Sequence, residues 1–171
     1  MDKIVDPFAP AHARLAPERA EDAAEVERLI EAAFGPGRYA KSVERLREQT
    51  RPCAGLSRTA WLKDELVGAV RLWPIRIGEA RAVLLGPIAV KRGCRGLGLG
   101  AQLVEDACAA ASRTGERLVL LVGDTPFFGP LGFTMAPVGV ILPGPVDRRR
   151  LLLRELAPGA AEGLSGHILP A

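Results

Sequence analysis

A basic, glycine-rich segment lies in the middle of the chain, between a strand-like run and a helix-like run. Residues 81–90 have the length and the apolar content of a strand. Apolar residues then recur at helical spacing over residues 97–111, and Gly115 is the type of residue that ends a helix. The segment between these runs contains Lys91, Arg92 and Arg95. The chain must therefore pass from a strand into a helix through a positively charged loop.

The start of the expected helix has the chemistry of an anion site. The first turn of a helix contains N–H groups that have no partner within the helix, and the helix dipole favours anions there. Gly96, Gly98 and Gly100 allow a phosphate to approach the backbone without meeting a Cβ. Together with the three basic side chains of the loop, these glycines predict a site for a pyrophosphate group.

Two other phosphate-binding motifs fit this segment less well. A P-loop ends in Gly-Lys-Ser/Thr, which is absent. The relaxed dinucleotide fingerprint matches Gly96, Gly98 and Ala101, and Asp124 follows the next strand-like run. However, residues 91–95 separate the strand from the first glycine, whereas the dinucleotide fold turns tightly at that point. Too few residues follow Asp124 to complete a doubly wound sheet, so a dinucleotide-binding protein stays a remote alternative.

The order of the other expected elements predicts an α+β fold with a mixed sheet. Helical periodicity covers residues 18–34, 40–49 and 97–111, and strand-like runs cover residues 59–62, 66–73, 81–90 and 117–122. The first three strand-like runs are joined by short connections and are therefore expected to be antiparallel. The third run contains Pro87, which cannot donate to a strand ladder, so we expect an edge or a bulge there.

The composition is typical of a single globular domain. The chain has 171 residues, of which 48% are hydrophobic and 25% are charged. No apolar run approaches the ~18 residues of a membrane span, and the first residues lack the apolar core of a signal peptide. We therefore expect a cytoplasmic protein with no membrane partner. The net charge of +3 comes from arginines spread along the chain, so no nucleic-acid partner is expected.

The cysteines and histidines do not predict a metal site. Cys53, Cys94 and Cys108 lack the spacing of metal ligands, and His12 and His167 lie near opposite ends of the sequence. We therefore expect no metal cofactor. Arg95 is close to Cys94, but the surrounding loop is expected to bind phosphates, so a covalent role for this thiol is not favoured.

Three segments resemble the GNAT superfamily of acyl-CoA-dependent N-acyltransferases, in its small bacterial single-domain form. Residues 95–100 match the pyrophosphate signature Gln/Arg-x-x-Gly-x-Gly/Ala, residues 85–90 resemble the family's fourth strand, and residues 120–133 resemble its strand–helix–strand ending in Gly-Phe. The resemblance covers residues 12–156. It leaves residues 1–11 as an N-terminal arm and residues 157–171 as a tail or a final short element. It implies a mixed sheet flanked by helices, with antiparallel strands and one parallel, splayed pair.

The resemblance also implies a binding mode for acetyl-CoA, which would lie between the strands of residues 81–90 and 117–122. Backbone N–H groups near residues 85–88 would face the thioester carbonyl. The implied cofactor-binding residues are Ile88, Ala89, Val90, Arg95, Gly96, Leu97, Gly98, Leu99, Gly100 and Ala101.

The implied reaction is direct transfer of the acetyl group to an amine within a ternary complex. The family often uses a tyrosine as the acid that protonates the departing thiolate, but the matching residue here is Phe128, which cannot act as an acid. Asp124 is the candidate catalytic base, and the alternative interpretation of this residue is a helix N-cap. The acceptor would be a small-molecule or peptide amine, and a homodimer is left open. The alternative function is a non-catalytic acyl-CoA-binding or regulatory protein.

Overall fold

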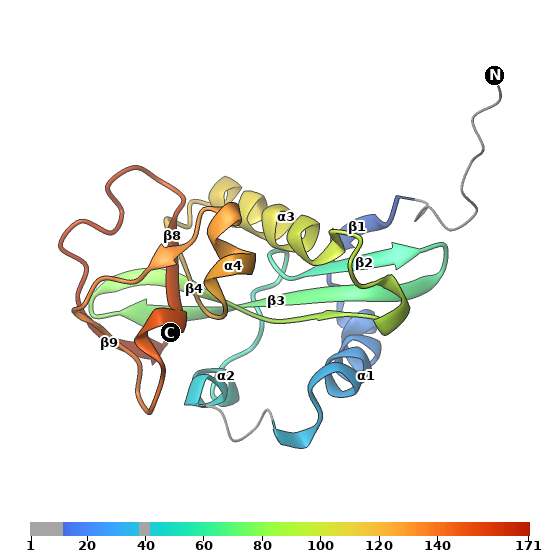
Figure 1. Ribbon diagram of the computed structural model, residues 1–171, viewed down its shortest axis with the longest axis horizontal. Coiled ribbons are helices and arrows are strands. Elements are labelled where there is room, and N and C mark those ends of the chain that lie inside the picture. The colour runs from blue at the N-terminus through green and yellow to red at the C-terminus, as the bar shows by residue number, and fades with distance from the viewer. Residues whose placement is uncertain (1–11, 38–41) are drawn as a thin grey trace.

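The computed structural model describes residues 12–37 and 42–171, and within them it contains a sheet of nine strands flanked by helices (Figure 1). The strands are β1 (Arg14–Pro17), β2 (Arg58–Leu62), β3 (Glu65–Ile77), β4 (Ala80–Val90), β5 (Leu118–Val122), β6 (Thr134–Met135), β7 (Val140–Ile141), β8 (Leu151–Glu155) and β9 (Gly166–Pro170). The helices are α1 (Ala23–Phe34), α2 (Arg45–Glu48), α3 (Leu99–Arg113) and α4 (Thr125–Phe128).

The sheet is mixed, as the sequence predicts. The main strand order is β1-β2-β3-β4-β5-β8-β6, and β9 pairs with both β3 and β7. Strands β1 to β4 are antiparallel neighbours, β4 and β5 are parallel, and β5 and β8 are antiparallel. Helix α3 supplies the crossover between the two parallel strands, which is the connection that a parallel pair requires. The α+β class with a parallel pair between antiparallel strands is therefore confirmed, and β7 and β9 form a second, short parallel pair that was not predicted.

Helices α1 and α3 cover opposite faces of the sheet (Figure 1). The alternation of side chains along β3 explains this arrangement, because neighbouring residues of a strand point to opposite faces. Ala69 packs in a buried cluster with Ile30 of α1. The next residue, Val70, packs in a different cluster with Leu103 of α3. The strand is therefore buried on both sides, which agrees with its nearly continuous apolar sequence.

A bulge interrupts β4 where the sequence contains proline. In the pairing of β3 with β4, Val70 lies opposite Ile88, but Leu72 lies opposite Leu85. The residues Gly86-Pro87 are therefore left out of the regular register, which is how a ladder accommodates a residue without an N–H group. Because β4 lies between β3 and β5, the expected bulge is confirmed and the edge position is excluded.

The parallel pair separates along its length, as expected. Strands β4 and β5 are paired at Val83 with Val119 and at Leu84 with Leu120. Strand β4 continues to Val90, whereas β5 ends at Val122. Beyond Leu84 the two strands therefore diverge, and the edge of β4 that faces β5 no longer has a strand partner there.

The first two expected helices are shorter in the structure. Residues 18–34 were expected to form one helix, but α1 begins at Ala23 and follows a 3₁₀ turn over Ala20–Asp22. In this turn Asp22 accepts hydrogen bonds from the backbone and side chain of Arg19, a capping arrangement that fixes the start of the helical segment after Glu18. The expected helix of residues 40–49 is a 3₁₀ turn at Ser42–Glu44 followed by α2, and its first two residues lie outside the described part.

The C-terminal residues are part of the sheet. Strand β9 pairs with Ile75, Arg76 and Ile77 of β3, so β3 extends past the expected end at residue 73. Residues 1–11, the expected arm, lie outside the described residues. Within the described ranges no helix is long and apolar enough to cross a membrane.

Candidate active site

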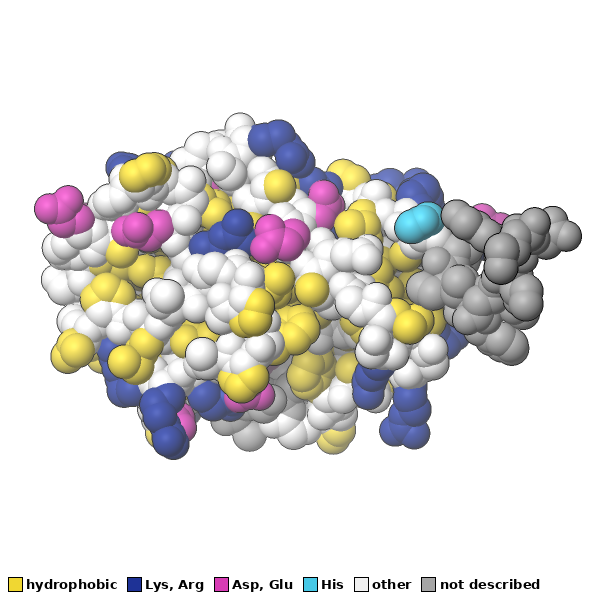
Figure 2. Space-filling view, turned by 45° about the horizontal axis from the view of Figure 1, so that its top comes forward, with side chains coloured by type: hydrophobic (Ala, Val, Ile, Leu, Met, Phe, Trp, Pro, Cys, Tyr) yellow, Lys and Arg dark blue, Asp and Glu magenta, His cyan; other side chains and the backbone are white. Residues whose placement is uncertain are grey.

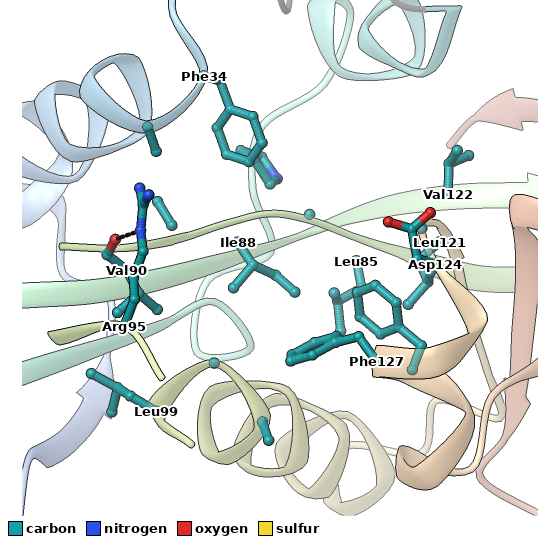
Figure 3. A pocket seen from close by; sticks show the side chains of 18 of the residues that line it. Phe34, Leu85, Ile88, Val90, Arg95, Leu99, Leu121, Val122, Asp124 and Phe127 are labelled. Carbon is teal, nitrogen blue, oxygen red and sulfur yellow. Dashed lines mark hydrogen bonds between the residues drawn. The ribbon is translucent and has the colours of Figure 1, made fainter. Parts of the chain in front are cut away.

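A cavity of about 810 Å³ lies where β4 and β5 separate. We call it the cleft. One side is formed by the second half of β4, the loop after it and the first turn of α3, and another by the end of β5 and α4. The end of α1 and the residues around α2 close the remaining side. Figure 3 shows Phe34, Ile88, Leu85 and Phe127 around this space, with Arg95 and Asp124 toward different ends.

The first turn of α3 presents backbone N–H groups to the cleft. Gly98 is the N-cap and has a left-handed backbone with a φ of 78°, and no side chain caps the helix. The N–H groups that follow it cannot be bonded within the helix, and Leu99, Gly100 and Ala101 all line the cleft. A Cβ on Gly96 or Gly98 would have no atom within 4 Å. The positive φ of these two glycines, and not internal packing, therefore explains why they lack a side chain, and the space beside them is open.

Arg95 lies beside this helix start and is fixed by the strand that precedes it. Its Nε donates a hydrogen bond of 2.9 Å to the carbonyl oxygen of Val90, which is drawn in Figure 3. The side chain is exposed and lines the cleft. Its guanidinium is positively charged, and the chain enters α3 a few residues after Arg95. The charge of Arg95 and the N-terminus of α3 each favour an anion in this part of the cleft.

The backbone of β4 supplies a second set of polar groups. Ile88, Ala89 and Val90 line the cleft at a level where β5 no longer pairs with β4. Backbone N–H and C=O groups on that edge need partners, so an extended ligand can bond to this edge as an additional strand would. All of the cofactor-binding residues named from the sequence line the cleft except Leu97, whose side chain is exposed.

Asp124 lies at the end of β5, and its carboxylate is bound by Arg150. Arg150 Nε donates to Asp124 Oδ1 at 3.0 Å, and 73% of the Asp124 side chain is exposed. Its backbone carbonyl accepts hydrogen bonds from the N–H groups of Phe127 and Phe128, so Asp124 is the N-cap of α4. The expected N-cap position of Asp124 is therefore confirmed, although its side chain makes no capping hydrogen bond. The role of Asp124 as a catalytic base stays a prediction.

Phe128 belongs to both the core and the wall of the cleft. Its ring is buried and makes edge contacts with the rings of Phe127 and Phe133, with centroids 4.7 and 5.7 Å apart. Phe127 is more exposed and reaches toward the first turn of α3, where a Cβ on Gly100 would lie 3.4 Å from its Cζ. Phe128 also belongs to a buried cluster of aliphatic side chains that includes Leu85 and Leu121, so its surroundings are apolar.

A buried ion pair on the opposite wall was not predicted from the sequence. Arg47 Nη1 donates to Glu44 Oε2 at 2.8 Å, and the two side chains are only 10% and 11% exposed. Both residues line the cleft. Their spacing of three residues is the one signal in the sequence, because residues i and i+3 share a helix face. That spacing gives no indication that the face is buried against β4.

The basic side chains are otherwise scattered. On the face shown in Figure 2, Lys and Arg side chains lie apart from one another among neutral and hydrophobic ones, with no continuous basic surface. This distribution agrees with the expectation that the charge of the chain is general arginine usage.

The splayed pair, the open edge of β4 and the glycine-rich helix start form a cleft between two strands whose shape and polar groups suit an elongated anionic ligand. Comparison with known proteins identifies the class. Residues 23–133 match the model of the acetyltransferase (GNAT) family. The chain therefore belongs to the GNAT family of acetyltransferases. It is 31% identical over 117 residues to YhbS of Escherichia coli, described as an uncharacterised N-acetyltransferase, and the match spans 67% of this chain and 70% of YhbS.

Solved structures share the fold. The crystal structure of E. coli YhbS in complex with CoA superimposes with a TM-score of 0.81 at 24% identity, covering 94% of this chain and 90% of that one. A GNAT acetyltransferase from Brucella melitensis in complex with acetyl-CoA has a TM-score of 0.71 at 24% identity, covering 94% and 96%. Naa50 of Arabidopsis thaliana, in complex with the bisubstrate analogue CoA-Ac-MVNAL, has a TM-score of 0.57 at 17% identity, covering 84% and 99%.

Proposed function

We propose that this protein transfers the acetyl group of acetyl-CoA to an amine by direct attack within a ternary complex. The observation that supports it most is the coincidence of two features in one cleft. The glycine-lined N-terminus of α3 offers N–H groups to a pyrophosphate, and the open edge of β4 offers backbone groups to an extended arm. The structural neighbours from E. coli and B. melitensis contain CoA and acetyl-CoA.

Acetyl-CoA would lie extended along the cleft, with its pyrophosphate at the start of α3 and its thioester near the bulge of β4. Its pyrophosphate would bind at the backbone of residues 95–100, with Arg95 adding charge. Its pantetheine arm would follow Ile88 and Val90. Since the Val90 carbonyl already accepts a bond from Arg95, the arm would share that oxygen, which has a second lone pair. The thioester would then lie near the bulge at Gly86-Pro87, where the backbone leaves the regular ladder.

The chemistry requires two proton movements. The acceptor must lose a proton, because only a neutral amine attacks a carbonyl. The thiolate of CoA leaves more easily than an alkoxide would, so water can protonate it after departure. Phe128 takes the place of the family's usual acid and supplies no proton. Asp124 is one candidate for accepting the amine proton, although Arg150 already binds it.

A second function is favoured by Phe128 itself. Without an acid at this position, the chain could bind acyl-CoA without turnover and act as a regulatory protein. The acceptor in the enzymatic case would be a small-molecule or peptide amine. Among the structural neighbours, Naa50 is one that was crystallised with a peptide-containing analogue.

Two measurements separate these functions. Calorimetry should detect CoA and acetyl-CoA but not NAD or NADH, and binding of NADH with no CoA signal would restore the dinucleotide alternative. Release of free CoA should then be followed with spermidine, 2-phenylethylamine, L-lysine and a short peptide with a free N-terminus. Release above the enzyme-free rate with one of them supports the transferase. Tight acetyl-CoA binding, with no release of CoA above the enzyme-free rate for any of these amines, supports the regulatory protein.

A further inference from the structure

Two acidic residues line the cleft among those the structure describes, and they lie in different surroundings. Glu44 is 9% exposed and comes from the 3₁₀ turn that precedes α2. The Asp124 side chain is 73% exposed at the end of β5. A proton acceptor acts on a substrate from within hydrogen-bond reach. A buried carboxylate that still borders the cavity meets a bound substrate with less competition from bulk water than an exposed one does.

The position of Glu44 is defined through Arg47. Arg47 Nη1 bonds to Glu44 Oε2 at 2.8 Å. On its other side, Arg47 Nη2 lies 3.0 Å from the point where a Cβ on Gly86 would be. The ion pair therefore extends from α2 to the β4 bulge. A side chain at residue 86 would press against the guanidinium of Arg47. The guanidinium therefore lies between the Glu44 carboxylate and the bulge.

The bulge is where the proposed function places the thioester, and an attacking amine would approach the thioester carbon along the wall that lies opposite the bulge. That wall is formed by the end of α1 and by the residues around α2, including Phe34, Val43 and Glu44. Phe34 and Val43 are apolar, so Glu44 is the acidic group on this wall. Arg47 donates to Oε2 of Glu44, which orients the carboxylate and balances its charge. The proposal concerns the same carboxylate, whose second oxygen is Oε1.

We propose that Glu44 accepts the proton of the acceptor amine, with Arg47 as its positioning residue. In the step, the amine nitrogen bonds to the thioester carbon and the carbon–sulfur bond breaks with its electron pair on sulfur. The nitrogen passes one proton to Glu44, which later releases it to solvent or to the CoA thiolate. The products are the N-acetylated amine and CoA. This inference rests on the proposed transferase function.

The test compares Glu44→Gln with the wild type, using the probe amine from the panel above that gives the fastest CoA release. Glu44→Gln keeps the shape of the side chain and removes the basic oxygen. A general base contributes about 10²–10⁴-fold, so kcat/KM at pH 7 should fall by about 10²-fold or more. The loss should shrink as pH rises, because more of the amine is then neutral before it binds. The acetyl-CoA Kd should not change. Glu48→Gln, at an exposed residue of the adjoining helix α2, is the matched control and should behave as the wild type.

A double variant separates catalysis from structure. Glu44→Gln removes the negative charge that Arg47 Nη1 contacts, which could disturb the wall. Glu44→Gln/Arg47→Gln removes both charges. If Glu44 is the base, the double variant stays as slow as Glu44→Gln while its melting temperature recovers. Recovery of kcat/KM in the double variant would overturn the inference.

Other results would also overturn the role of Glu44 as the proton acceptor. A loss in Asp124→Asn with full activity in Glu44→Gln would assign the proton to Asp124 and overturn the role of Glu44. An equal loss at every pH would mark Glu44 as structural. A wild type that binds acetyl-CoA but acetylates none of the probes overturns the proposed function itself, a result distinct from an active wild type with an equally active Glu44→Gln.

Discussion

The Cδ2 atom of Phe128 lies 2.7 Å from the point where a Cβ on Gly123 would be placed. Gly123 follows β5 directly, so the ring closes over the end of the strand and is held there by its edge contact with Phe133. The absence of a side chain at residue 123 therefore sets how deeply Phe128 enters the wall of the cleft.

We expect Gly123→Ala to push the Phe128 ring out of this position. Overpacking of a close-packed site costs about 1–3 kcal/mol of unfolding free energy, measurable by urea denaturation. Gly37→Ala is the control, since a Cβ there would have no atom within 4 Å and its φ is not positive. An unchanged unfolding midpoint for Gly123→Ala would show that the ring moves without cost.

We expect Phe128→Tyr to raise kcat several-fold with little change in acetyl-CoA affinity. The substitution adds one hydroxyl to a ring that lines the cleft, and a positioned acid speeds thiolate departure. The gain is smaller than for a poorer leaving group, because a thiolate needs less help. The assay is single-turnover CoA release, with the melting temperature as a check on folding. An unaltered, fast transfer step in both proteins would contradict the idea that Phe128 marks a lost acid.

We expect Gly98→Val to abolish acetyl-CoA binding in a folded protein. Gly98 has a φ of 78°, which a β-branched residue does not adopt without strain, and a side chain there would occupy the approach to the first turn of α3. Arg95→Ala should weaken binding by about 1–3 kcal/mol through loss of a charge-assisted bond. Calorimetry measures both, and unchanged affinity in both variants would rule out the assigned pyrophosphate site.

We expect the three cysteines to differ in reactivity. Burial raises the pKa of the Cys53 and Cys108 thiols to about 11, so at pH 8 both stay protonated and react slowly with iodoacetamide. Cys94 lines the cleft beside Arg95, and we expect it to be alkylated first and to be protected by acetyl-CoA. Mass spectrometry of digests measures the rates. Labelling of all three should become equal in denaturant, and fast native labelling of Cys108 would contradict its burial.

The parts of the site that the sequence predicts depend on residues that are close to one another along the chain. The helix start at residues 96–100 and the bulge at Pro87 follow from local rules, because glycine and proline restrict the backbone where they stand. The partners of the charged groups depend on tertiary packing. Asp124 meets Arg150 across the end of β5, and Glu44 with Arg47 meets Gly86 across the cleft. No spacing in the sequence indicates these contacts, so the sequence predicts residues 40–49 only as a helix and assigns them no part in the site.

The pairing of β9 with β3 has a consequence for how the protein is made. Ile75 and Ile77 are completely or almost completely buried, and they gain their second neighbouring strand from Ile168 and Pro170. During translation, residues 75–77 leave the ribosome long before residues 166–170 exist. This stretch of β3 is therefore an unprotected sheet edge on the nascent chain, and such edges recruit other strands. Contacts between distant parts of a sequence also slow folding, so the completed sheet can close only after synthesis has passed β9.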